Sequence, residues 1–164
     1  MKKIIFILFL ATSCASIKNI EFEKNNINTV LNNWHKAAAM AQFEAYFNMM
    51  SDRSIFIGTD ANENWTKTEF MTYAKPYFDK GKAWNFVALE RHIYFSNDGK
   101  TAWFDELLNT QMKICRGSGV MQIENGSWKI KHYVLSMTIP NENSNEVTKI
   151  KTPIEDALIK RLKN

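Results

Sequence analysis

Cysteine is scarce in this sequence. Cys14 and Cys115 are the only two, which excludes a framework of several disulfide bonds. A concentrated basic segment is lacking too: the Lys and Arg residues are scattered and not interleaved with aromatic residues, so nothing indicates a nucleic-acid partner. The formal net charge of +4 falls to +2 without Lys2 and Lys3, when 19 basic residues face 17 acidic ones.

Several motifs of catalysis and metal binding are also missing. His35, His92 and His132 fall on three different predicted elements, without the spacing of a zinc or iron site. Residues 117–119, Gly-Ser-Gly, are too short for a phosphate-binding loop and lie inside a predicted strand. Ser118 lacks the surroundings of a hydrolase nucleophile. We therefore expect no metal, no cofactor and no serine hydrolase.

The apolar run near the N-terminus, residues 4–10, is too short to span a bilayer. Two lysines precede it, and the small residues 11–13 follow it, directly before Cys14. This arrangement resembles a bacterial lipoprotein signal, in which the cysteine becomes the lipidated first residue of the mature protein. We expect a signal peptide over residues 1–13 and a lipid-anchored position in the cell envelope. Ala11 stands where Leu is usual, so ordinary secretory cleavage is the alternative.

Lipidation of Cys14 would leave Cys115 without an internal partner. A disulfide between the two is the competing explanation, and it would pin the start of the mature chain to a central strand. Residues 14–26 are polar and rich in asparagine, which predicts a tether between the anchor and the folded domain.

The rest of the sequence predicts one α+β domain. Its 45% hydrophobic and 23% charged residues are typical of a globular chain. Helical spacing of apolar residues predicts a helix over about residues 28–50. A short apolar strand over 54–57 follows, and then a helix to about residue 80. Thr66 or Thr68 can cap it, with Glu69 three residues after Thr66 as in a capping box, and Pro76 inside it should kink or divide it.

Four long strands are predicted after this helix, over residues 84–96, 101–112, 113–124 and 127–139. Asn125-Gly126 is a strong hairpin signal. Gly117 and Gly119 inside the third strand indicate a bend or a close approach of backbone. Residues 141–164 are predicted to be a polar linker and a short amphipathic helix over 153–162.

Several stretches resemble one family. They are Phe56–Asp60 with Glu63 and Trp65, Phe104–Glu106, Arg116–Gly119, and the ending Gly126–His132 through Ser136. Together they are similar to the SnoaL-like branch of the NTF2-like superfamily over residues 27–140. The resemblance implies a highly curved antiparallel sheet wrapped around N-terminal helices, a cavity at the wide end of this cone, and often a dimer formed through the sheet. The family's frequent second histidine is Val134 here, which weakens a mechanism that needs two.

Alternation along the last predicted strand places Trp128, Ile130, His132, Val134 and Ser136 on one face. This face is mostly apolar yet carries a histidine and a serine, as the wall of a pocket would; a structural histidine is the alternative. The high aromatic content of 13% suits a cavity lined by rings, or else a tightly packed core. His35 lies at the edge of the first helix's apolar stripe and is predicted to be a boundary residue.

Asp105 and Glu106 are neighbours on a strand, so only one of them can face the cavity. If either met His132, the pair could perform general acid–base catalysis, with Arg116 stabilising an anion. The alternative is an Arg–carboxylate pair that neutralises buried charge between strands.

Two functions follow from these residues. The first is an exported, lipid-anchored module that binds a small apolar molecule or an envelope protein, with a homodimer possible. The second is a small isomerase or dehydratase that uses His132 with Asp105 or Glu106. The candidate ligand-binding residues are Trp34, Asp60, Trp65, Trp103, Arg116 and Ser136.

Overall fold

The computed structural model describes residues 12–163, with side chains from Ile20 onward, and shows an α+β fold. The predicted signal peptide falls largely outside the described residues, as does the side chain of Cys14. The elements are α1 (Thr12–Ala39), α2 (Phe43–Asn48), β1 (Met50–Ile57), β2 (Asn64–Thr66), α3 (Lys67–Asp79), β3 (Val87–Phe95), β4 (Thr101–Thr110), β5 (Lys113–Glu124), β6 (Ser127–Met137), the 3₁₀ turn η1 (Asn141–Asn143) and α4 (Ser144–Leu162).

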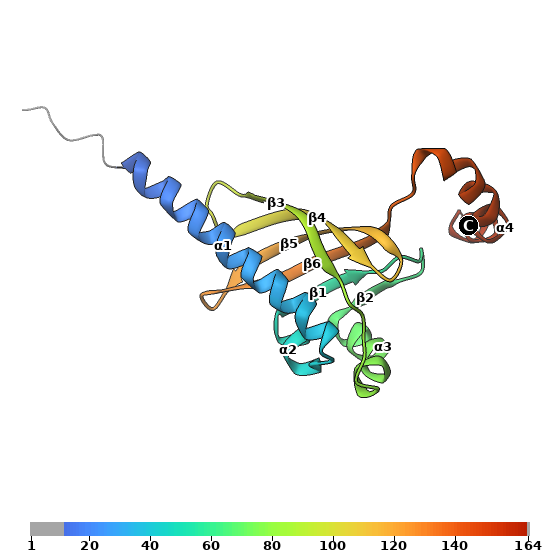
Figure 1. Ribbon diagram of the computed structural model, residues 1–164, viewed down its shortest axis with the longest axis horizontal. Coiled ribbons are helices and arrows are strands. Elements are labelled where there is room, and N and C mark those ends of the chain that lie inside the picture. Colours follow the sequence, from blue (N-terminus) through green and yellow to red (C-terminus); the bar gives the residue numbers. More distant parts are fainter. Residues whose placement is uncertain (1–11, 164) are drawn as a thin grey trace, which may run out of the picture.

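The strands form one curved sheet in the order β2-β1-β6-β5-β4-β3 (Figure 1). All neighbouring pairs are antiparallel except β1 and β6, which run parallel, so the sheet is mixed. The four long predicted strands are confirmed within a few residues. β3 begins later than predicted because the ring of Trp84 packs against Tyr46 and Phe78, at centroid distances of 5.5 and 5.4 Å, which leads residues 83–86 away from the sheet.

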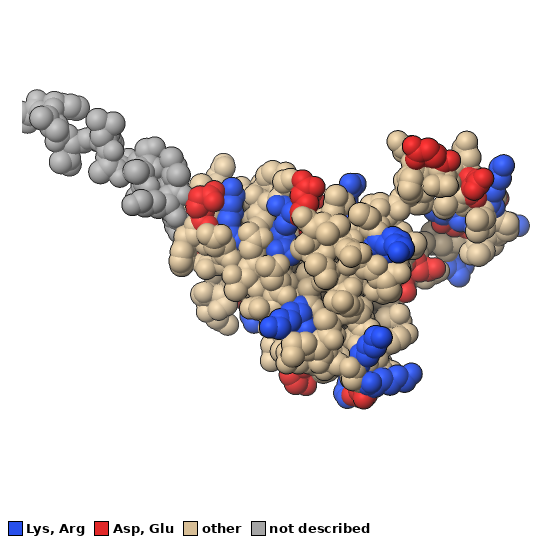
Figure 2. All heavy atoms as spheres, viewed as in Figure 1, with Lys and Arg blue, Asp and Glu red and all other residues tan. Residues whose placement is uncertain are grey.

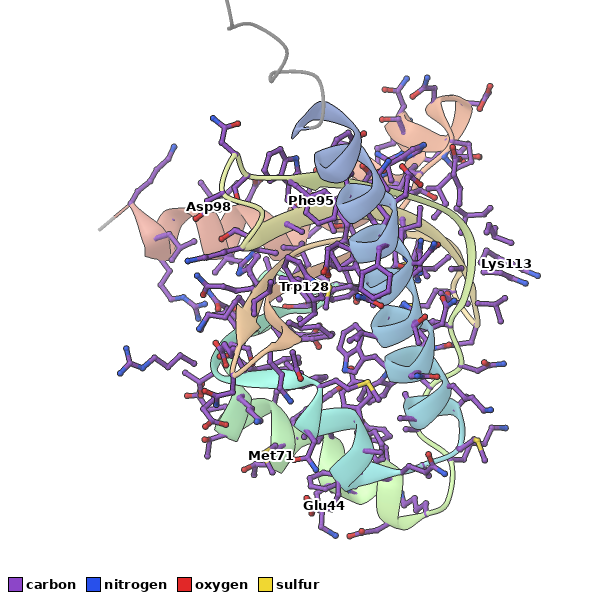
Figure 3. All side chains as sticks on the ribbon, turned by 90° about the vertical axis from the view of Figure 1, so that its left-hand side faces the viewer. Glu44, Met71, Phe95, Asp98, Lys113 and Trp128 are labelled. Atoms are coloured by element: carbon purple, nitrogen blue, oxygen red, sulfur yellow. The ribbon has the colours of Figure 1, made fainter. Side chains whose placement is uncertain are left out.

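Helix α1 crosses the concave face of the sheet, and side chains fill the space between them (Figures 1 and 3). Residues at helical spacing on α1 are buried in the core: Ile27, Leu31, Trp34 and Ala38. Helices α2 and α3 pack together beyond the end of α1, where Phe43 and Phe78 meet edge to face at 5.4 Å.

The first helix differs from its prediction at both ends. It continues through residues 14–26, where we expected a tether, and this segment is held to the sheet because the Trp128 indole N–H donates to Glu23 at 2.6 Å. At the other end the helix stops at Ala39 instead of running to residue 50. Ala41 adopts a positive φ of 51°, which turns the chain into the separate helix α2.

The capping box predicted for α3 is present. The Thr66 side chain accepts from the backbone N–H of Glu69, and the Glu69 carboxylate accepts from the backbone N–H of Thr66. Of the two predicted effects of Pro76, a kink or a division of the helix, the division is wrong, since α3 is continuous from Lys67 to Asp79. The proline lies in the last turn, so the helix forgoes one backbone hydrogen bond, to the carbonyl of Thr72, and ends soon afterwards at Asp79.

Helix α4 protrudes from the body of the domain (Figure 1) and begins nine residues before the helix that we predicted. None of its residues is buried. Arg161 near its end donates to the Asn62 side chain at 3.0 Å. Charges of both signs are scattered over the face in Figure 2, as the sequence predicted. Within residues 12–163 we find no helix with the length and apolar character that crossing a bilayer requires.

Candidate functional site

A β-bulge in β6 decides which side chains face the interior. Val120 of β5 pairs with His132, but the next residue, Met121, pairs with Ile130, so Lys131 is the extra residue. The bulge reverses the alternation: Trp128 and Ile130 point inward before it, and Tyr133 and Leu135 point inward after it. His132 therefore lies on the outer face. The expectation that it shares the inner face with Trp128 was wrong, because strict alternation fails across the bulge.

Strand β4 pairs with β5 without a bulge, so its side chains alternate regularly between the two faces. This alternation shows which face each of the two carboxylates, Asp105 and Glu106, lies on. Ala102, Phe104 and Leu108 are buried on the inner face, and Glu106 shares that face with 1% of its surface exposed. Asp105 points to the outer face, where His92 lies opposite it on β3. Glu106 is thus the inward carboxylate that residue parity alone left undecided.

The Glu106 carboxylate is the acceptor at the centre of a buried polar cluster. One oxygen, Oε1, accepts from His35 Nε2 at 2.9 Å and from the Tyr133 hydroxyl at 3.0 Å. The other, Oε2, accepts from Arg91 Nε at 2.9 Å and Arg91 Nη2 at 2.7 Å. Four donors from α1, β6 and β3 therefore meet one carboxylate of β4, and together they satisfy both of its oxygens.

The cluster holds the carboxylate ionised. Burial opposes the charged form, but the hydrogen bond and charge interaction with His35, followed by those with Arg91, outweigh it and lower the pKa of Glu106. Burial, and then the nearby Glu106 charge, raise the pKa of Tyr133 well above its ordinary value, so this hydroxyl stays a donor. Gly117 permits the contact, because a Cβ there would lie 2.2 Å from the Tyr133 hydroxyl. The close approach of backbone predicted for the two glycines is present at Gly119, where a Cβ would lie 2.4 Å from the His132 carbonyl oxygen; at Gly117 it is a side chain that approaches.

A pocket of about 170 Å³ opens beside this cluster. It lies between α3, the β1–β2 loop, the segment before β3 and the β4–β5 turn. Six aromatic rings line it: Phe56, Trp65, Phe70, Tyr73, Trp84 and Phe86. Its polar lining consists of Thr59, Glu63 and Gln111, together with the backbone of Gly58.

Two of these rings separate the pocket from the polar cluster. Phe56 stacks on Tyr133 with centroids 5.6 Å apart, and Phe86 meets the His35 ring edge to face at 6.0 Å. His35 is only 4% exposed, and Tyr133 is fully buried. The ionised carboxylate and its donors therefore lie behind the aromatic wall and do not open into the pocket.

The structure distributes the predicted ligand-binding residues over three places. Trp65 lines the pocket, and Asp60 lies in the loop at its mouth, where hydrogen bonds from the Asn62 backbone and side chain lower the Asp60 pKa. Trp34 is a core residue, stacked on Tyr46 at 4.8 Å. The remaining three, Trp103, Arg116 and Ser136, lie on the outer face of the sheet.

The outer face carries its own polar group, separate from His132. His92 lies between two carboxylates, with Nδ1 3.1 Å from Asp105 and Nε2 3.1 Å from Glu90. The hydrogen bond with Asp105 raises the His92 pKa. Asp105 on β4 and His132 on β6 are separated by β5. Across β5 the residue in register with Asp105 is Val134, not His132, so the predicted dyad is not brought together.

His35, Arg91 and Tyr133 were not predicted as site residues. A signal existed for His35: it follows Leu31 by four residues, which places it on the buried face of α1. The other two had none, because Tyr133 faces inward only through the bulge and Arg91 reads as an ordinary strand cation. Across the described part of the chain, no three His, Cys, Asp or Glu side chains are grouped as metal ligands. Cys115 is a free and fully buried thiol.

Comparison with known proteins gives a family and a fold. The model of the family described as "SnoaL-like domain" matches residues 27–140. Among solved structures, an NTF2-like protein of Pseudomonas putida is similar with a TM-score of 0.63 and 11% identity, over 75% of this chain and 92% of that one. An NTF2-like protein of Cytophaga hutchinsonii gives 0.59 and 17%, over 70% and 98%. A candidate scytalone dehydratase of Novosphingobium aromaticivorans gives 0.65 and 11%, over 75% and 89%. No curated protein matched the sequence.

Replacing Glu106 tests whether the cluster stabilises the fold. We expect Glu106→Ala to lower the free energy of unfolding by about 3–5 kcal/mol, because Arg91 and His35 would remain buried without their acceptor. The neighbouring Asp105→Ala is the matched control, since that carboxylate is half-exposed on the other face, and it should change stability little. Urea unfolding at pH 7 measures both. Equal effects of the two changes would contradict the assignment.

The same measurement at low pH tests the charge state of Glu106. Because the folded state lowers the pKa of Glu106, its stabilisation is present at neutral pH and is lost as the pH falls below the ordinary carboxyl pKa of about 4.3. The difference in unfolding free energy between the wild type and Glu106→Gln should therefore shrink from pH 7 to about pH 3. A constant difference would show that Glu106 is not an ionised acceptor.

Proposed function

We propose a binding function for this chain, which belongs to the SnoaL-like family of the NTF2-like superfamily. In this proposal the protein is exported, anchored by a lipid, and holds a small, largely apolar molecule in its aromatic pocket. The observation that carries it is the division of the interior: rings line the pocket, while the buried carboxylate is saturated by four donors behind them. The pocket thus offers contact surface and no exposed acid–base pair.

The size of the pocket supports a small ligand. Its volume of about 170 Å³ is below the ~300–1,000 Å³ usual for pockets that hold drug-sized molecules. Near-parallel rings favour a flat or compact apolar body: Trp65 lies 9° from the plane of Phe70 and 25° from that of Tyr73. We expect the ligand to occupy the space beside these three rings.

Proton-transfer chemistry is the second candidate function, and one observation favours it. The Nδ1 atom of His35 is buried and has no hydrogen-bond partner in the described residues, and the His35 ring contacts Phe86 of the pocket wall. Movement of Phe86 would let a ligand reach this nitrogen. The catalytic pair would then be His35 with Glu106, in place of the His132 pair expected from the sequence.

Removing one pocket ring tests ligand binding, with indole as the probe. Tyr73 and Tyr77 both lie on α3 and are 42% and 44% exposed, but only Tyr73 lines the pocket. Tyr73→Ala should weaken indole binding about tenfold, a loss of about 1.4 kcal/mol. Tyr77→Ala is the matched control and should bind as the wild type does.

Shifts of the tryptophan side-chain N–H signals in NMR spectra give the dissociation constants. Equal affinity of the two tyrosine variants, or no binding of indole at all, would contradict a ligand in this pocket. Enzymatic conversion of a bound carbonyl compound, lost in His35→Gln, would favour the second candidate function instead.

The lipid anchor is proposed from the N-terminal sequence alone. When the full chain is expressed in a bacterium, Cys14→Ser should move the protein from the membrane fraction to the soluble fraction. Cys115→Ala removes the other cysteine and should leave it in the membrane fraction. If the wild-type protein is found in the soluble fraction after export, the signal peptide is removed by ordinary secretory cleavage and the anchor proposal fails.

A second copy of the chain is the partner that we propose for the outer face of the sheet. Tyr94 and Trp103 stack there with centroids 6.0 Å apart, and each is 47% exposed. Trp103→Glu should convert a dimer into a monomer in sedimentation experiments, whereas Ile150→Glu on the exposed helix α4 should not. A monomeric wild type would overturn the dimer and leave another envelope protein as the expected occupant of this face.

A further inference from the structure

The mouth of the pocket carries a carboxylate that the chain holds in place. The Oε2 atom of Glu63 accepts the backbone N–H of Asp60 at 3.1 Å, and its backbone carbonyl accepts the N–H of Gly58 at 2.9 Å. A Cβ on Gly58 would lie only 2.1 Å from that same oxygen, so the carboxylate rests directly over the glycine. Glu63 is half-buried, and its side chain belongs to the pocket wall.

No cation of the described chain neutralises this group within the pocket. The lining contains no Lys, Arg or His, and none of the ion pairs between described side chains includes Glu63. Arg161 contacts this loop from the exposed helix α4, where it bonds to Asn62 and is screened by solvent. The Glu63 carboxylate accepts one backbone N–H but pairs with no opposite charge among the described side chains, and a positively charged ligand would supply that charge.

The aromatic wall favours the same ligand chemistry. Ring faces attract cations, and groups of rings recognise quaternary ammonium ions. The negative field of Glu63 also reaches these rings. The pKa of Tyr73 is raised to about 12, first by burial, then by its hydrogen bond with Tyr77 and the Tyr77 charge, and in addition by the charge of Glu63. Of these causes only the Glu63 charge favours a cation, because burial disfavours charge of either sign.

We infer that the pocket selects an organic cation, of the class of small alkylammonium or arylammonium ions, with Glu63 pairing its charge and the rings of Trp65, Tyr73 and Trp84 enclosing its apolar groups. This inference rests on the proposed binding function and adds the charge of the ligand to it. The remaining rings, Phe56, Phe70 and Phe86, form the apolar floor.

Choline and 3,3-dimethylbutanol are the test ligands, because they have the same shape and differ by the positive charge. We expect the wild-type protein to bind choline about fivefold or more tightly than the neutral alcohol. Glu63→Gln keeps an acceptor for the Asp60 N–H and removes the charge, so it should abolish the preference. Glu44→Gln on α2, outside the pocket lining, is the control for loss of one negative charge and should keep it.

Gly58→Ala is a second variant, which tests the position of the Glu63 carboxylate instead of its charge. It keeps the charge but displaces the carboxylate, and it should also reduce the preference for choline. NMR titration measures all four proteins against both ligands. Salt should weaken choline binding more than binding of the alcohol, because an ion pair at an open mouth is screened.

The outcomes separate this inference from the binding proposal. Equal or tighter binding of the alcohol would overturn the cation and leave a neutral ligand pocket. If indole binds and neither test ligand does, the inference of a cationic ligand fails, while the proposed binding function stands. A choline preference that survives in Glu63→Gln would overturn the role of Glu63. If indole, choline and the alcohol all fail to bind, both proposals fall.

Discussion

The ion pair between Arg91 and Glu106 is the interaction on which the interior of this domain depends. Both side chains are removed from solvent, with 6% and 0% of their surfaces exposed. A buried charge is tolerated only when its partners satisfy it fully, and here the partners come from three other elements. Arg91 also donates to Asn28 and Asn32 at 3.0 and 2.9 Å. The pair therefore fixes α1 against the edge of the sheet. Its neighbours His35 and Tyr133 in turn contact Phe86 and Phe56 of the pocket lining.

Much of the architecture could be predicted because it follows from local rules. Alternating strands, the turn at Asn125-Gly126 and the capping box of α3 need only neighbouring residues, and all three are present. The break between α1 and α2 and the length of α4 could not be predicted so well. Ala41 has no sequence signal for a positive φ, and α4 contains Pro153, which suggested a helix boundary where the chain continues.

The site was harder to predict because one extra residue changes everything that follows it on a strand. Up to Ile130 the alternation of β6 was right, and beyond Lys131 every side chain faces the opposite side. Lys131 donates to Glu124 across the hairpin and to Ser51 of β1, both at 3.0 Å, so one of the contacts that hold the bulge comes from a residue 80 positions away. Such contacts leave no local pattern. That Tyr133, and not His132, lies on the inner face could therefore be learned only from the structure.

The different positions of Glu106 and Glu63 are the reason that we propose binding over catalysis for this chain. Glu106 is paired so completely that it cannot accept a proton from a ligand without breaking the bonds that hold α1 to the sheet. Glu63 has the opposite character: among the described residues, its carboxylate accepts from the backbone N–H of Asp60, and the pocket is open beside it. One fold thus holds a negative charge that stabilises the structure and another at the pocket mouth. The rings of Phe56 and Phe86 lie between the two, so in the proposed function a ligand would meet the charge of Glu63 and not the acid–base groups of the interior.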